Sequence, residues 1–217
     1  MTTDVASSWD RIITWLHAHA PTTAAAVNPP ATDEAIDDAA WTVGVPLPAD
    51  IRALYRAADG MWDAPTAGCL IPPVYGLYPL EEALCFQRVR VNAFAERDGS
   101  DERWGTAEEV DGAPAGTLGV RWSQHWLPLA TSGLGIVLFA DLRYGRLRGS
   151  VMTYDRIEGA DAPPVWPTVS AMLADIADAL DHDGTAAGHR PYVDEEARLD
   201  WRWPAPTSTR THRGSEP

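Results

Sequence analysis

The segment GVPLPADIRALYRAADG, residues 44–60, constrains the fold more than any other part of the chain, because it holds a helix with a stop at each end. Pro48 suits the first position of a helix, and Gly60 can adopt the left-handed conformation that ends one. The apolar residues between these stops recur at helical spacing and form one face: Ile51, Leu54, Tyr55 and Ala58. The segment therefore predicts a buried scaffold helix, followed by a loop that carries Trp62.

Other parts of the chain show the same apolar periodicity of about 3.6 residues, together with residues that start or stop helices. The predicted helices are residues 9–19, capped by Ser7 or Ser8; a helix between its cap Thr32 and Gly44; residues 81–96; and a helix that Thr168 caps and that ends before Gly184. The Pro- and Ala-rich stretch between the first two of these helices is predicted to be a connector.

The second half of the chain changes to strand chemistry. Predicted strands are residues 126–130, 135–142 and 149–154, with turns at Ser132-Gly133 and Tyr144-Gly145 between them. Residues 136–139 form a continuous apolar run, which is typical of a central strand covered on both faces. Residues 190–204 predict a small hairpin with DEEA as its turn. Helices packed against a mainly antiparallel sheet make an α+β fold, and 217 residues favour a single domain.

The composition limits the classes of partner. The formal net charge is −14, and the chain contains no lysine, so nucleic acid is not an expected partner. A basic protein partner is consistent with this charge, although acidity also serves solubility alone. Ten tryptophans suit either a core or an interface. The sequence does not set the oligomeric state.

The chain shows neither a secretion signal at its N-terminus nor a run of apolar residues long enough to span a membrane. Cys69 and Cys85 are its only cysteines, and they do not form a CxxC pair. We therefore expect a cytoplasmic protein without membrane attachment, with both thiols reduced and buried.

Motifs of catalysis are missing from the sequence. It contains no GxSxG, HExxH, Walker or GxGxxG pattern. Asp181, His182 and Asp183, with His189 nearby, offer metal-ligating groups, but a fraying helix end explains them better. The sequence predicts no catalytic residue, no metal and no cofactor. An unrecognised hydrolase or metal enzyme is the minor alternative.

Aromatic residues beside acidic ones are the stronger signal. Trp62 follows a helix stop, Tyr75 and Tyr78 flank a corner that contains glycine, and Trp104 lies in a polar, acidic stretch predicted to be a surface loop. An aromatic anchor surrounded by acids suits protein binding. The alternative is that the first three aromatic residues only cover the edge of the core.

The order of these elements resembles the SUKH superfamily, which includes the Smi–Knr cell-wall-assembly regulators and many bacterial immunity proteins. The resemblance rests on several stretches in order, over roughly residues 9–203. They are WDRIITWL, PPATDEAIDDAAWTVGVPLPADIRALYRAADG, GCLIPPVYGLYPLEEAL, RWSQHWLPLATSGLGIVLFADL, VSAMLADIADAL and RLDW. The stretch around residues 44–60 is the most distinctive of them.

The resemblance implies an α+β domain without catalytic residues, here residues 7–204, followed by a disordered tail at 205–217. It also implies a protein-binding module, either an immunity protein that neutralises a cognate, basic toxin domain or a regulatory scaffold in cell-wall synthesis or signalling. A toxin gene beside this one would favour the first. The expected partner-binding residues are Asp59, Trp62, Asp63, Tyr75, Tyr78, Trp104, Glu108, Glu109, Asp111 and Asp141.

Overall fold

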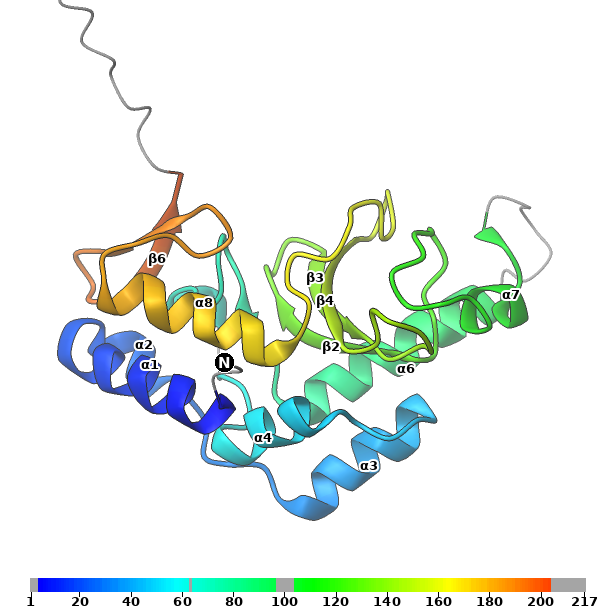
Figure 1. Cartoon of the computed structure of the whole chain (residues 1–217), viewed down its shortest axis with the longest axis horizontal. Helices are drawn as coiled ribbons and strands as arrows, with labels where there is room; N and C mark the ends of the chain where they lie inside the picture. The colour runs from blue at the N-terminus through cyan, green and yellow to red at the C-terminus, as the bar shows by residue number, and fades with distance from the viewer. Residues whose placement is uncertain (1–3, 63, 97–103, 204–217) are drawn as a thin grey trace, which may run out of the picture.

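A computed structural model describes residues 4–62, 64–96 and 104–203. It has the expected α+β architecture, with helices around a four-stranded antiparallel sheet and a separate two-stranded hairpin (Figure 1). The helices are α1 (Val5–His19), α2 (Pro21–Ala25), α3 (Asp33–Val43), α4 (Ala49–Ala57), α5 (Ala64–Ala67), α6 (Leu80–Ala95), α7 (Ala107–Asp111) and α8 (Val169–Asp181). The strands are β1 (Gly76–Leu77), β2 (Trp126–Thr131), β3 (Ile136–Asp141), β4 (Ser150–Asp155), β5 (Arg190–Val193) and β6 (Leu199–Arg202). The predicted tail at 205–217 lies outside the described residues.

The larger sheet has the order β1-β2-β3-β4, so β3 lies between two full-length neighbours. Phe139 of β3 is paired with Pro128 on one side and with Met152 on the other. Pro128 cannot donate a backbone hydrogen bond, and the register shifts between Pro128 and Ala130. The sheet tolerates this proline because β1 is short and pairs only with the last two residues of β2.

Strand β3 is buried on both faces, as its apolar run predicted. Leu138 and Ala140 point to one core, and Val137 and Phe139 point to the other. This alternation is the period of two that every strand imposes on its side chains. The fold therefore has to cover the sheet from both sides.

The larger core lies between the sheet and the helices. Helices α1 and α8 lie side by side, and α4 packs against both (Figure 1). Their apolar stripes are buried and face the same core: Ile12, Leu16, Ile51, Leu54, Leu173 and Ile176. Ile51 and Leu54 lie on the apolar face predicted from the sequence, and the other four residues lie on predicted helices.

The smaller core is aromatic and covers the other face of the sheet. The ring of Trp122 meets those of Trp126 and Tyr154 edge-on, with centroids 5.4 and 4.9 Å apart. Phe94 of α6 closes this core. The Trp122 indole donates a hydrogen bond to Gln87 of α6, which satisfies its polar atom away from water. Aromatic side chains of this size bury a large area with few residues.

Several predicted helix caps are confirmed. The Thr32 and Thr168 hydroxyls accept hydrogen bonds from the backbone N–H groups of Ala35 and Ala171, at 3.2 and 3.0 Å. Gly44 ends α3 in the left-handed conformation, with φ of 72°.

Other local expectations are wrong. The first helix starts at Val5 rather than at residue 9, and its cap position is Asp4, because Ser8 is buried inside the helix. The expected connector contains the short helix α2, which Pro21 begins. Cys85 is exposed on α6, whereas Cys69 is partly buried, and burial raises the pKa of its thiol to about 11.

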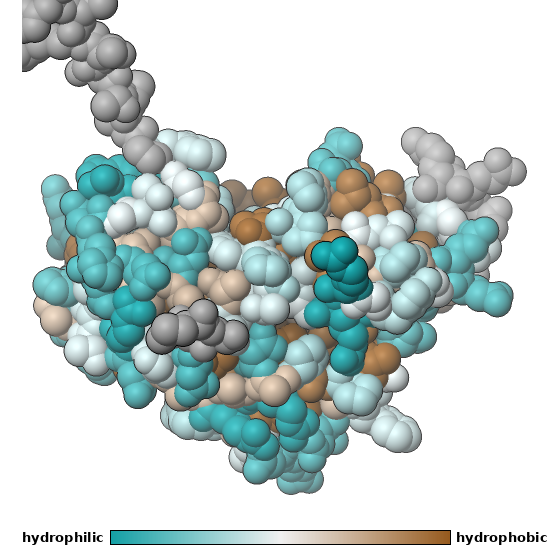
Figure 2. Space-filling model, viewed as in Figure 1, coloured by the Kyte–Doolittle hydropathy of each residue, from teal (hydrophilic) through white to brown (hydrophobic). Residues whose placement is uncertain are grey.

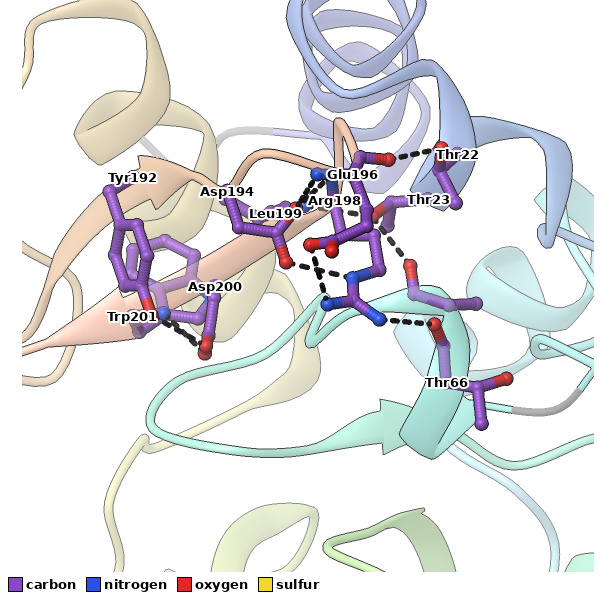
Figure 3. Close-up of polar contacts among 11 residues, drawn as sticks. Thr22, Thr23, Thr66, Tyr192, Asp194, Glu196, Arg198, Leu199, Asp200 and Trp201 are labelled. Atoms are coloured by element: carbon purple, nitrogen blue, oxygen red, sulfur yellow. Dashed lines mark hydrogen bonds and ion pairs between the residues drawn. The ribbon is translucent and has the colours of Figure 1, made fainter.

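The C-terminal hairpin is fastened to the N-terminal helices. Figure 3 shows Arg198 between Asp194, Glu196 and Thr66, with its guanidinium 2.8 Å from the Asp194 carboxylate. The Thr23 hydroxyl accepts from the backbone N–H of Leu199 at 2.9 Å and donates to the carbonyl of Ala67. The two ends of the chain therefore close the larger core together.

A buried ion pair holds α7 and the segment after it against the sheet. The Arg143 guanidinium contacts both carboxylate oxygens of Asp141, at 3.0 and 2.7 Å, and also donates to the carbonyls of Val110 and Thr117. The Asp141 carboxylate also accepts from the backbone N–H of Gly116 at 2.8 Å. All charged atoms of this pair have hydrogen-bond partners, as burial requires.

Replacing Gly60 with alanine should destabilise the protein strongly. A Cβ atom at this position would lie 2.3 Å from the backbone N of Pro79 and from the carbonyl carbon of Tyr78, and φ is +71°. We expect Gly60→Ala to lower the free energy of unfolding by at least about 2 kcal/mol in urea denaturation. Gly119→Ala is the matched control, because no atom lies within 4 Å of its added Cβ. Equal stability of the two variants would contradict the assigned turn.

Removing the charge of Asp141 should also destabilise the protein strongly. Asp141→Asn leaves the Arg143 charge buried and uncompensated, so we expect a loss of about 3–5 kcal/mol in the free energy of unfolding. Asp33→Asn breaks the exposed pair with Arg56 and should cost less than about 1 kcal/mol. If urea denaturation gave similar losses for both variants, the ion pair would not have the role assigned to it.

Candidate functional site

The expected binding residues fall into two groups at opposite ends of α6. Tyr78 lies just before the first residue of this helix, Leu80, and Trp104 packs against Phe94 near its end. Fourteen residues of α-helix span about 21 Å at 1.5 Å per residue. The structure therefore does not bring the four aromatic candidates into one patch.

In the first group, Asp59 is part of the scaffold. Its carboxylate accepts a hydrogen bond from the backbone N–H of Leu80 at 2.8 Å and so caps the start of α6. Its own backbone N–H donates to the carbonyl of Pro29 at 2.9 Å. Asp59 joins three segments and has little freedom to reach a partner.

Trp62 is exposed, with 56% of its surface accessible. Its indole N–H donates to the carbonyl of Ala25 at 3.2 Å, and its backbone N–H donates to the carbonyl of Ala26 at 3.0 Å. The ring is thus held against the end of α2 while much of it faces solvent. Asp63 lies outside the described residues.

The two tyrosines differ. Tyr75 is buried in the larger core, as the alternative interpretation from the sequence had it. Tyr78 is half-buried, and its hydroxyl contacts Thr131. Burial raises the pKa of Tyr78, so this hydroxyl stays protonated and able to donate a hydrogen bond at neutral pH.

A hollow of about 500 Å³ lies beside Tyr78, between the start of α6 and the β2–β3 turn. Its apolar wall includes Met61, Leu77 and Phe86, and the Glu82 side chain lines it. At the tip of the β2–β3 turn, Leu134 is 80% exposed. Tyr78 and Glu82 line the hollow, and Trp62 and Leu134 are the chain neighbours of its lining residues Met61, Gly133 and Gly135. We call Trp62, Tyr78, Glu82 and Leu134 the Tyr78 surface. It combines aromatic and apolar area with one carboxylate.

In the second group, the segment expected to be a loop contains α7. Thr106 caps this helix: its hydroxyl accepts from the backbone N–H of Glu109 at 3.2 Å, and the Glu109 carboxylate accepts from the backbone N–H of Thr106 at 2.8 Å. This bond lowers the pKa of Glu109 and keeps it charged. Glu108 and Glu109 are exposed.

The other residues of the second group are partly or fully buried. The Trp104 ring stands edge-on to Phe94, with centroids 5.7 Å apart, and covers the aromatic core. Asp111 accepts from the Ser123 hydroxyl at 2.6 Å and from the backbone N–H of Gln124. Asp141 is buried in its ion pair with Arg143, so it does not belong to a surface.

Sequence reasoning missed Trp41 and Leu134, which are the two most exposed large apolar residues in the described part of the chain. Trp41 follows the buried Ile36 and Ala39 on α3 but lies off their stripe, so helical phase is the signal that could have identified it. Leu134 stands between two glycines in a predicted turn, where an apolar side chain has no core to enter.

Two kinds of feature are not found in the described part of the chain. Among the described residues, no three His, Cys, Asp or Glu side chains gather where they could hold a metal ion. No described helix is both long and apolar enough to cross a membrane. What the surfaces offer is aromatic area, apolar hollows and carboxylates.

Comparison with known proteins agrees with the motifs. A model of the SMI1 / KNR4 family (SUKH-1) matches residues 30–175, which is well over half of the chain. The match runs from just before α3 into α8, so α1, α2 and the β5–β6 hairpin lie outside it. No curated protein matches the chain.

Proposed function

The chain belongs to the SMI1 / KNR4 family (SUKH-1), and on this premise we propose that it is a non-catalytic, protein-binding immunity protein. It acts in the cytoplasm, without a cofactor, by covering a cognate toxin domain. The binding domain spans residues 7–204. Family membership carries this proposal, because the resemblance implies binding rather than chemistry.

The Tyr78 surface is the best candidate for the first contact with the partner. Interface cores are rich in aromatic residues that are exposed in the free protein, and binding buries them. Trp62 and Leu134 have this exposure, and the hollow beside Tyr78 can receive a side chain of the partner. Of the ten residues expected from the sequence, Trp62, Tyr78, Glu108 and Glu109 stay in the proposal.

The charge of the chain supports a basic partner. A net charge of −14 attracts a basic domain over distances of about a Debye length, which is about 8 Å at physiological salt. Glu82 borders the hollow, and Glu108 and Glu109 are exposed at the far end of α6. Such contacts raise the association rate more than the affinity and weaken as salt rises.

We expect affinity purification from the lysate of the source cell to retain one basic protein, encoded beside this gene, at low salt and less of it at high salt. Mass spectrometry identifies the retained protein. With that protein purified, Trp62→Ala combined with Glu82→Lys should weaken binding by about 30-fold or more in calorimetry, since a hot-spot residue contributes about 2 kcal/mol.

Trp203→Ala is the control for the loss of an exposed tryptophan, because Trp203 is also highly exposed but packs against His189 beside the C-terminal hairpin, with ring centroids 4.1 Å apart. Equal weakening by both changes would contradict the assigned surface. Retention of several cell-wall or signalling proteins, without a toxin, would contradict the immunity role and favour a regulatory scaffold.

A further inference from the structure

The connection between α3 and α4 forms an apolar groove of about 750 Å³. Gly44 turns the chain after α3, and the chain then runs through Val45, Pro46 and Leu47 to α4. These residues line the groove. Trp41, on the last turn of α3, forms the lip. None of the residues lining this groove lines the hollow beside Tyr78.

Trp41 is the most exposed large apolar residue described, with 88% of its surface accessible. Its helix buries the opposite stripe: Ile36, Ala39 and Val43. A tryptophan placed on the solvent face of a regular helix adds nothing to the core of its own chain. A single exposed apolar residue is ordinary, but Trp41 adjoins the apolar groove, and a concave patch of this kind marks a contact site.

The charges around the groove favour a basic occupant. Glu34, Asp37 and Asp38 lie seven, four and three residues before Trp41, so they share its face of α3. Arg52 neutralises Asp37 at 2.8 Å, while no ion pair reaches Glu34 or Asp38 within the described part of the chain. Figure 2 shows a hydrophilic surface over the lower part of the molecule, where Figure 1 places α3.

The helix itself adds to this negative field. Trp41 lies at the C-terminal end of α3, which carries the negative pole of the helix dipole. No basic residue is present in the last turn of α3 to offset it. A cation on a partner could pair with Glu34 or Asp38 and would also interact favourably with this end of the helix.

The walls of the groove are held in place. The His125 Nδ1 contacts the Val43 carbonyl at 2.7 Å, and the Arg148 guanidinium donates to the Pro46 carbonyl at 2.6 Å. Both bonds come from the sheet side of the molecule and fix the two ends of the turn. A site that is already ordered loses little entropy when it binds.

We propose that the α3–α4 groove binds a basic segment of a protein partner, with one large apolar side chain against Trp41 and lysine or arginine beside Glu34 and Asp38. The inference rests on the proposed protein-binding function and adds a second contact surface to it. The apolar groove would hold the large side chain of the segment, and the carboxylates would select a positively charged segment over a negatively charged one.

The direct test uses a short amphipathic peptide of leucine and lysine, with a leucine–glutamate peptide of the same pattern as the acidic counterpart. Fluorescence anisotropy of the labelled peptides measures affinity, and the indole N–H signals in ¹⁵N NMR spectra locate the contact. The signal missing from Trp41→Ala identifies Trp41. We expect this signal to shift with the basic peptide and not with the acidic one.

We expect Trp41→Ala, and separately Glu34→Lys with Asp38→Lys, to weaken binding of the basic peptide by about ten-fold or more. The control for charge is Glu158→Lys with Asp161→Lys, which makes the same change at an exposed turn away from the groove. Equal weakening by the control pair, or a shift of the Trp62 signal in place of Trp41, would overturn the proposal.

Two further outcomes distinguish a basic partner segment in the groove from a second copy of the chain and from binding at the Tyr78 surface alone. Self-association in sedimentation velocity that Trp41→Ala abolishes would mean that a second copy of this chain fills the groove, and would overturn the basic segment as occupant. Binding of the natural partner that is lost with the Trp62 and Glu82 changes but unaffected by Trp41→Ala would overturn the groove alone and leave the proposed function intact.

Discussion

Strand β3 is apolar on both faces, and this requirement determines much of the architecture. Leu138 and Ala140 need cover from one side and Val137 and Phe139 from the other, so the sheet cannot face water anywhere along its centre. Helices α1, α4 and α8 supply one cover, and α6 with the Trp122 cluster supplies the other. Removing either layer would expose several large side chains, each of which contributes about 1.5–3 kcal/mol by its burial.

Most of the tryptophans are buried or partly covered, so the exposed ones are the candidates for contact with a partner. Trp9, Trp122, Trp126, Trp166 and Trp201 are buried, and Trp15 and Trp104 are partly covered. Trp41, Trp62 and Trp203 remain exposed; Trp41 lines the α3–α4 groove, and Trp62 follows Met61, which lines the hollow beside Tyr78. The scaffold thus presents exposed aromatic side chains and carboxylates, which suits the proposed recognition of a basic protein.

Sequence periodicity predicted the elements whose signals are local. Thr32 and Thr168 cap the starts of helices and Gly44 caps the end of one, as predicted. The apolar run at 136–139 lies in the central strand β3. The site was harder to predict, because burial depends on contacts far apart in the chain. Asp141 was expected at the surface, but its partner Arg143 holds it inside together with Val110 and Thr117. The sequence around Trp104 predicts a surface loop, but the ring packs against Phe94 of α6, which closes the aromatic core. For Trp41, the only signal in the sequence is its position on α3, off the buried stripe of that helix.

We propose that this chain works by covering a partner with the surfaces around Tyr78 and Trp41. Hydrogen–deuterium exchange of the chain, alone and with its captured partner, tests the claim most directly. We predict slower exchange in the partner complex at the end of α3 with the turn after it, and at the start of α6 with the β2–β3 turn. Protection confined to α1, α8 or the β5–β6 hairpin, with no change at those segments, would contradict the account.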